Sequence, residues 1–198
     1  MVYTNFDPSA QDILENYLHN DIDSDKSAIL TDKENRIIAY YSTCGCIERQ
    51  AGSALKPLAV FAPAIELNTV CAETPVLDER TDFDGYSPSN YGDKYYGYIT
   101  VREALAKSLN VPAVKILNAT GVKRAREIAK KLDIGLTEGD NSLTLALGCT
   151  EKGVSLKNLT AAYGIFYNQG YYCAPHAVSK ITAGSQTVYT AEPYKNKI

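Results

Sequence analysis

The spacing of apolar residues changes three times along the chain, between helical and strand-like periods, and this pattern most limits the folds that the chain can adopt. After Asp7-Pro8, apolar residues recur at helical intervals and predict a helix over about residues 8–19, because Asp accepts hydrogen bonds from free N–H groups and Pro suits the first helical position. Two β-branched or aromatic runs, 27–31 and 36–42, then surround the polar turn 32–35 and predict a hairpin.

The remainder of the chain is mainly helical in pattern. Helical spacing predicts helices over 53–66, 100–107, 112–119, 122–132 and 156–168. Residues 177–182 and 187–190 flank a Gly-Ser turn and predict a second hairpin. Residues 68–98 are rich in Pro, Gly and Tyr without a steady period, and we expect them to be pinned on a surface or groove. This order predicts an α+β fold in which helices predominate, within a single domain over residues 1–198.

Composition excludes several classes of function. The net charge is −3, and the 20 Lys and Arg residues are scattered, so the chain has no electrostatic footprint for nucleic acid. No run approaches the ~18 apolar residues that a membrane span needs. The two histidines and five cysteines form no zinc pattern, so neither a metal nor another cofactor is predicted. The cysteine count is odd, and we interpret most of these residues as free or buried thiols.

The segment around Ser53 carries the strongest chemical signal. Ser53 and Lys56 are three residues apart, so on a helix both side chains lie on one face. A serine hydroxyl becomes a good nucleophile when a neighbour takes its proton, and a lysine can do so if burial lowers its pKa. Gly52 allows a sharp turn, and Pro57 is tolerated only near a helix start, which places Ser53 in or beside the first turn. Alone, this spacing also fits an exposed Ser and Lys.

A second candidate group is Ser108-Leu109-Asn110, between two predicted helices. A turn of this kind can point a hydroxyl and a carboxamide in the same direction, one to relay a proton and one to hold a substrate amide. By itself the pattern fits equally well an Asn at a helix end with a neighbouring Ser.

Taken together and in order, these segments resemble penicillin-binding proteins. Gly52-Ser53-Ala54-Leu55-Lys56-Pro57 resembles the nucleophile motif G-S-x-x-K-P of that family. Residues 86–114 look like the stretch leading through its S-x-N motif, and residues 147–175 match a further block. Residues 2–11 look like the opening of the transpeptidase domain in class A, bifunctional members.

The resemblance implies a helix-rich penicillin-binding/serine β-lactamase-like transpeptidase fold and D,D-transpeptidation of bacterial peptidoglycan. Ser53 would attack the D-Ala–D-Ala carbonyl of a stem peptide and form an acyl-enzyme, and Lys56 would accept its proton. Ser108 would relay a proton towards the leaving amine, and Asn110 would hold the amide side chain of the substrate. β-Lactam antibiotics would acylate Ser53 because their strained amide mimics the same dipeptide. The parent protein would be membrane-anchored and act at the extracytoplasmic face of the cell membrane.

One motif of the family is absent. No K-[ST]-G sequence occurs, and the nearest match is Lys180-Ile181-Thr182. In the family this strand supplies a cation, a hydroxyl and an oxyanion-hole N–H, so we expect an incomplete fold with part of the central antiparallel sheet missing and an impaired site. Either the chain is a fragment of a longer protein or a second polypeptide completes it.

Three functions compete. The first is an acyl-transfer enzyme, and the second is a β-lactam or peptidoglycan sensor acylated at Ser53 without turnover. The third is a scaffold for protein contacts, which the four intact motif residues disfavour. A serine β-lactamase is a variant of the first; it would need a deacylating carboxylate, and the setting of Glu151, the candidate by position, does not resemble that motif.

Overall fold

The computed structural model describes residues 1–19, 25–45, 48–192 and 195–198. The chain divides into two compact units. Unit 1 comprises residues 1–49, 131–134 and 155–198, and unit 2 comprises residues 50–130 and 135–154. The single domain over residues 1–198 stays a prediction.

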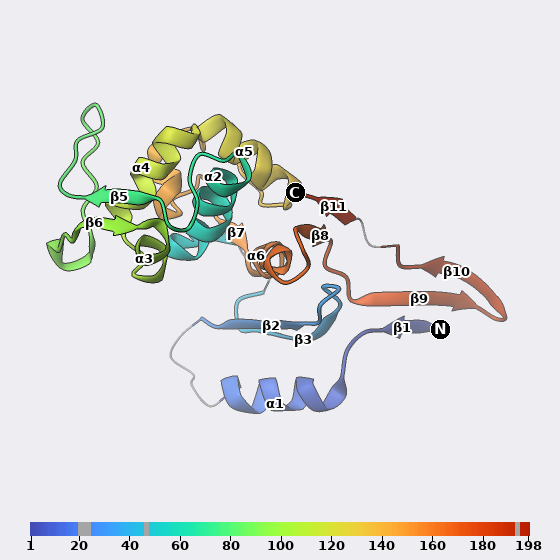
Figure 1. Ribbon diagram of the computed structural model, residues 1–198. Coiled ribbons are helices and arrows are strands. Elements are labelled where there is room, and N and C mark those ends of the chain that lie inside the picture. The colour runs from blue at the N-terminus through green and yellow to red at the C-terminus, as the bar shows by residue number, and fades with distance from the viewer. Residues whose placement is uncertain (20–24, 46–47, 193–194) are drawn as a thin grey trace. The chain divides into compact units, whose positions relative to one another are not determined.

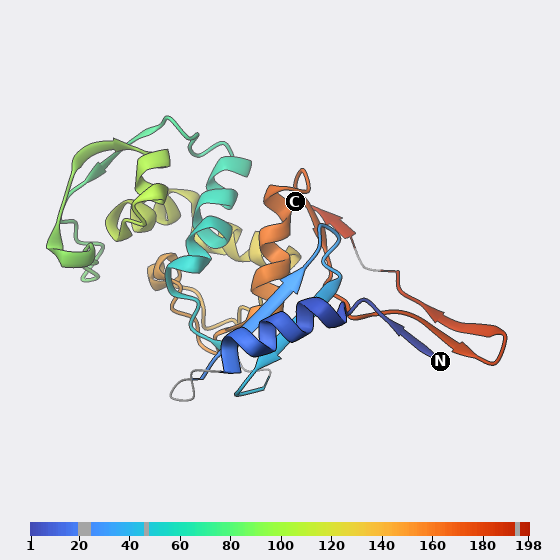
Figure 2. The same ribbon diagram turned by 90° about the horizontal axis from the view of Figure 1, so that it is seen from below.

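Unit 1 is built around the predicted N-terminal hairpin. Strands β2 (Ser27–Thr31) and β3 (Ile37–Ser42) pair antiparallel. Helix α1 (Pro8–His19) packs on β3 and helix α6 (Leu156–Tyr163) packs on β2, so the hairpin lies between two helices (Figure 1 and Figure 2). The first helix and both strands confirm the sequence prediction.

A buried asparagine fixes the turn of this hairpin. Asn35 is 2% exposed and adopts a left-handed φ of 56°. Its Nδ2 donates to the carbonyl of Ala161 at 3.1 Å and to that of Cys173 at 2.6 Å. The turn is thereby tied to α6 and to the C-terminal part of unit 1.

The rest of unit 1 consists of short strands. Strand β9 (Val178–Ala183) lies between β1 (Val2–Thr4) and β10 (Gln186–Thr190) in an antiparallel sheet, and β9 and β10 form the second predicted hairpin. Strand β8 (Tyr171–Cys173) pairs with β11 (Lys195–Lys197). The remaining elements are β4 (Glu48–Arg49) and the 3-10 helix η5 (Gly164–Phe166), with which the predicted helix over 156–168 ends.

Unit 2 has an almost wholly helical core. Its helices are η1 (Gly52–Leu55), η2 (Pro57–Phe61), α2 (Ala62–Glu66), η3 (Tyr91–Asp93), α3 (Val101–Ala106), α4 (Asn110–Thr120), α5 (Val122–Lys131) and η4 (Leu143–Leu147). Its strands are β5 (Pro75–Asp78), β6 (Gly97–Thr100) and the start of β7 (Val154–Ser155). Helix α4 packs against η2, α2 and η4, and buries Val111, Val114 and Leu117 fully.

The predicted helix over 53–66 forms with a change of winding. It begins as the 3-10 turn η1, widens to the π-helical turn η2, and ends as α2. Pro57 lies at the change, because it has no N–H to continue the regular ladder of hydrogen bonds. The N–H of Ala62 instead donates to the carbonyl of Pro57, five residues back.

Residues 68–98 contain regular structure that the sequence did not predict. Strand β5 pairs antiparallel with β6, with Val76 opposite Ile99. The predicted helix from Thr100 begins one residue later, because Thr100 is the N-cap of α3 and forms a capping box with Glu103. The predicted helix from Pro112 begins earlier, at Asn110.

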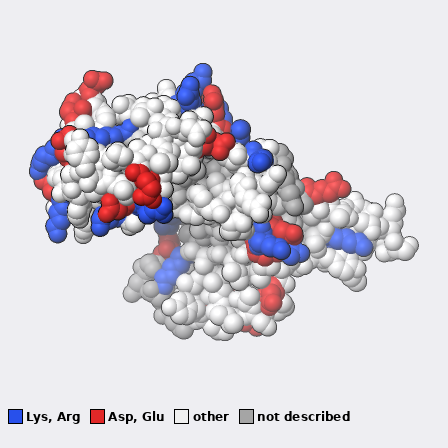
Figure 3. All heavy atoms as spheres, in the orientation of Figure 1, with Lys and Arg blue, Asp and Glu red and all other residues white. Residues whose placement is uncertain are grey.

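Charged side chains and free thiols occur in both units. Acidic and basic side chains are interleaved over the face shown in Figure 3. Within the described ranges, no helix is long and apolar enough to cross a membrane, and no group of three or more His, Cys, Asp or Glu could hold a metal. Cys44, Cys71, Cys149 and Cys173 are free thiols, whereas Cys46 lies outside the described residues.

Candidate active site

All four residues singled out from the sequence lie in unit 2. Ser53 is the second residue of the helical run that starts at Gly52, as its spacing to Pro57 predicted. Gly52 has a left-handed φ of 54°, which turns the chain into the helix. The side chain of Ser53 is exposed, and its hydroxyl has no hydrogen-bond partner among the described residues. It is therefore open to an incoming reactant.

Lys56 follows one helical turn later and points into the protein. Its side chain is only 1% exposed. The ammonium nitrogen Nζ donates to the carbonyl of Ser108 at 2.7 Å and to Oδ1 of Asn110 at 2.7 Å, and it lies 3.3 Å from Oγ of Ser108. Ser108 and Asn110, which follow Lys56 by 52 and 54 residues in sequence, thus both contact its Nζ atom.

The surroundings of Lys56 favour the neutral form of its amine. Burial lowers its pKa from 10.5 to about 8, because desolvation disfavours the charged ammonium. All three of its described partners are uncharged, so no carboxylate among them opposes this shift. About a tenth of the lysine is neutral at pH 7 with a pKa near 8, against roughly 0.03% at the ordinary value.

Ser108 occupies the position that ends helix α3. Its N–H donates to the carbonyl of Leu105 at 2.9 Å, and the N–H of Leu109 donates to that of Ala104 at 2.9 Å. This is a Schellman ending, which requires a left-handed residue, and Ser108 has a φ of 53° where glycine is usual. Leu109 completes it by packing on Ala104 in a buried cluster. The turn leaves the Ser108 side chain exposed beside Lys56.

Asn110 is the first residue of α4 and is half-buried. Its Oδ1 accepts from Lys56, and its Nδ2 donates to the carbonyl of Ser89 at 2.8 Å. Because Nδ2 carries two hydrogens, one of them remains available among the described contacts. The amide can therefore hold the lysine and still donate to a ligand.

A second group of contacts, which sequence reasoning missed, holds the turn that precedes Ser53. Gln50 and Thr150 form paired hydrogen bonds, one of which runs from the Thr150 N–H to Oε1 of Gln50 at 2.7 Å. Gly148 packs so closely on Gly52 that a Cβ there would lie 1.9 Å from the Gly52 carbonyl oxygen. Residues 148–150 thus brace the turn that precedes Ser53.

The structure gives no support to Glu151 as a deacylating base. Its carboxylate accepts a hydrogen bond from the hydroxyl of Thr137, and its N–H donates to Asp140 at 2.7 Å. It lies against the backbone of Gly139. Glu151 therefore serves to hold the 137–140 turn.

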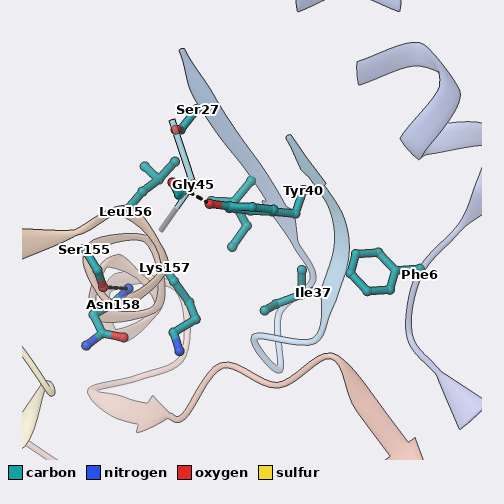
Figure 4. A pocket seen from close by; sticks show the side chains of 10 residues that line it. Phe6, Ser27, Ile37, Tyr40, Gly45, Ser155, Leu156, Lys157 and Asn158 are labelled. Carbon is teal, nitrogen blue, oxygen red and sulfur yellow. Dashed lines mark hydrogen bonds between the residues drawn. The ribbon is translucent and has the colours of Figure 1, made fainter. Parts of the chain in front are cut away.

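Unit 1 contains an apolar cavity of about 300 Å³ that takes no part in this arrangement. It lies between the β2–β3 hairpin and α6, and Ile37, Tyr40 and Leu156 are among the residues that line it (Figure 4). None of the four candidate residues lines it. The walls of this cavity are mainly apolar, whereas acyl transfer needs a nucleophile beside a base. We therefore place the candidate site at Lys56.

Comparisons with known proteins agree with the motifs. Residues 30–198 match the family model of the penicillin binding protein transpeptidase domain. The chain is 38% identical over 133 residues to penicillin-binding protein 1F of Bacillus subtilis, covering 67% of this chain and 18% of that protein. It is 37% identical over 144 residues to penicillin-binding protein 1A of Clostridium botulinum, covering 67% of this chain and 17% of that protein. The chain thus spans about a fifth of the length of these relatives.

Solved structures show the same fold. The penicillin-binding protein PonA1 from Mycobacterium tuberculosis superposes with a TM-score of 0.81 at 21% identity, covering 96% of this chain and 56% of that one. The D,D-transpeptidase domain of a peptidoglycan glycosyltransferase from Eggerthella lenta gives a TM-score of 0.83 at 14% identity, covering 99% and 61%. The α+β architecture is accordingly that of part of this fold. With the family model matched over most of its length, the chain belongs to the penicillin-binding protein transpeptidase domain family.

Proposed function

We propose that this chain carries the serine and lysine machinery of a peptidoglycan D,D-transpeptidase. The observation that carries the proposal is the buried Lys56, whose Nζ contacts both Ser108 and Asn110 one helical turn from the exposed Ser53. Nothing in the packing of a helix core requires a lysine there, because burying a cation costs free energy unless it is paired. A role as a base would explain why a lysine is buried at this position despite that free-energy cost.

In the proposed reaction, Oγ of Ser53 attacks the carbonyl carbon of the penultimate D-Ala of a stem peptide. The serine proton passes to the neutral amine of Lys56, and the C–N bond to the terminal D-Ala breaks. The leaving nitrogen takes a proton through Ser108, whose hydroxyl lies 3.3 Å from Lys56 Nζ. An amine of a second peptide then attacks the ester, forms the cross-link and returns the hydroxyl to Ser53.

Asn110 is proposed to bind the substrate. Its carbonyl oxygen is held by Lys56, which leaves the Nδ2 hydrogen not used by Ser89 to donate to a carbonyl of the stem peptide. β-Lactams would enter the same place and acylate Ser53 as their strained amide opens.

The absence of the K-[ST]-G motif lowers the acylation rate that we expect. Losing a single oxyanion-hole donor costs roughly 10²–10³ in rate, so acylation of this chain alone is expected to be slow unless another segment or chain supplies that strand. We propose peptidoglycan stem peptides and β-lactams as partners, and a membrane-anchored parent acting at the extracytoplasmic face.

Intact-protein mass spectrometry after incubation with benzylpenicillin tests the proposal. We expect a gain of one drug mass in the wild type and none in Ser53→Ala. A wild type that is folded by circular dichroism yet gains no mass over hours would refute acyl transfer by this chain. The rate at which the adduct disappears separates a turning-over enzyme from the alternative, a sensor that stays acylated.

A further inference from the structure

The N-terminus of α4 has no local cap, although it carries a site residue. The first N–H groups of a helix need acceptors, which a Ser, Thr, Asp or Asn at the N-cap usually supplies. In α4 the N-cap is Leu109, whose side chain cannot accept a hydrogen bond and is buried against Ala104. The acceptor must come from elsewhere in the chain.

Asn90 supplies it from twenty residues away in sequence. Its Oδ1 accepts from the N–H of Asn110 at 2.8 Å and from the N–H of Val111 at 3.1 Å. The side chain is 4% exposed, so water cannot replace it readily. Asn90 thus caps α4 in place of Leu109, at the residue whose side chain holds Lys56.

A buried carboxylate fixes the orientation of this amide. Asp78, on β5, is 1% exposed, and its two oxygens accept from Nδ2 of Asn90 at 2.8 and 3.0 Å. Nδ2 also lies 2.9 Å from the carbonyl of Lys94. A flipped amide would turn its oxygen on the carboxylate and its NH₂ on two N–H donors, so only one orientation satisfies both sides.

The neighbouring residue holds the same target. The carbonyl of Ser89 accepts from Nδ2 of Asn110, so the backbone and the side chain of Asn110 are both bound by the Ser89-Asn90 segment. With its Nδ2 engaged there, Asn110 presents Oδ1 to Lys56. The chain of contacts therefore runs from Asp78 through Asn90 and Asn110 to the lysine.

We propose that Asn90 is a positioning residue for the acylation step: oriented by Asp78, it fixes the start of α4 so that Asn110 holds the Lys56 amine in place. The inference rests on the proposed function for its kinetic meaning. It goes beyond that function because neither Asn90 nor Asp78 is expected to touch the substrate.

Two variants of position 90 test the inference. Asn90→Ala removes the cap, and we expect the acylation rate with benzylpenicillin at pH 8 to fall roughly 10- to 100-fold, the size expected when a reacting group is misplaced by about 1 Å. Ser155→Ala is the matched control, because Ser155 caps α6 by accepting from the N–H of Asn158 at 3.2 Å in unit 1. It loses one cap in the same way and is expected to acylate as the wild type does.

An exchange variant, Asp78→Asn with Asn90→Asp, separates positioning from mere stability. It keeps a donor facing an acceptor between the two side chains and keeps an acceptor on the α4 N–H groups, at the loss of the donor to Lys94. The negative charge moves from β5 to the start of α4, closer to Lys56 along the contacts. Because a nearby carboxylate favours the ammonium, we expect the acid limb of the pH–rate profile to shift upward by roughly one pH unit while the melting temperature stays close to that of the wild type.

Each possible result supports or overturns the positioning role of Asn90. If Asn90→Ala acylates at the wild-type rate, or if the exchange variant keeps its stability and its cap yet acylates as slowly as Asn90→Ala above the acid limb, the cap does not position Lys56 and the inference is wrong. If the wild type itself is not acylated, the proposed function fails, and the inference is then judged by NMR titration of Lys56 in lysine-labelled protein, assigned with Lys56→Gln. A Lys56 titration in Asn90→Ala identical to that of the wild type would overturn it.

Discussion

Replacing Lys56 by glutamine tests the electrostatics of the site without any need for activity. Glutamine removes the charge and keeps a donor for the acceptors that Lys56 Nζ now contacts, the Ser108 carbonyl and Asn110 Oδ1. The lysine pKa is lowered by burial from 10.5 to about 8. The folded state therefore binds the proton less tightly than the unfolded chain, so protonation of Lys56 opposes folding.

The size of the effect follows from the two pKa values. Between pH 8 and 10.5 the unfolded chain holds more protons than the folded one, and stability must rise with pH in this window. Integrated from about pH 7 to about pH 10, the lysine contributes a rise of about 2.5 kcal/mol. Because the side chain is fully enclosed, solvent screening removes little of this.

The assay is urea denaturation of wild type and Lys56→Gln at several pH values between about 7 and 10. We expect the variant to gain most over the wild type at pH 7 and to lose roughly 2–3 kcal/mol of that gain by pH 10. Other titrating groups are common to both proteins and cancel in the difference. Lys152→Gln, at an exposed lysine, controls for the loss of one positive charge. A difference between wild type and Lys56→Gln that stays constant over this range would show that the lysine does not have a depressed pKa.

Three further predictions test other parts of the arrangement. The acylation rate should rise about tenfold per pH unit up to pH 8 and then level off, because the neutral amine of Lys56 is the reactive form; a rate that does not change between pH 6 and 9 would contradict a lysine base. Gly148→Ala should slow acylation at least tenfold and lower the free energy of unfolding in urea by about 1–3 kcal/mol, since its Cβ collides with the Gly52 carbonyl. Wild-type kinetics would show that the turn before Ser53 can shift without affecting the reaction. Asn35→Ala should cost about 2–4 kcal/mol, because two buried carbonyls lose their donor and alanine must adopt a left-handed φ; a loss under about 1 kcal/mol would count against this account of the hairpin turn.

The features that the sequence predicted well are local ones. Both hairpins and the first helix follow from alternation, helical spacing and turn residues within a few positions of each other. The spacing of Ser53, Lys56 and Pro57 was also enough to place the serine in or beside the first turn of its helix.

The features that the sequence did not reveal depend on distant partners. Strands β5 and β6 are four residues each, and nothing but their mutual pairing across about twenty residues makes them strands. The contact of Gly148 with Gly52 and the cap of α4 by Asn90 join segments whose proximity only the fold creates. Leu109 at an N-cap position is the one local signal, since a leucine there implies that some other residue must satisfy the helix.

The side-chain amides of Asn90 and Asn110 lie between the Asp78 carboxylate and Lys56, and they keep that carboxylate out of contact with the amine. A carboxylate in contact with Lys56 would form an ion pair and raise the pKa of the amine, which would leave too little neutral base at pH 7. Asn110→Asp places such a carboxylate 2.7 Å from Nζ with little change of shape. We expect this variant to be acylated at least tenfold more slowly at pH 7 than the wild type, and NMR titration should find the Lys56 pKa above about 8. If Lys56 in Asn110→Asp still titrated near pH 8, the uncharged partners would not be what keeps the base available, and burial alone would have to explain it.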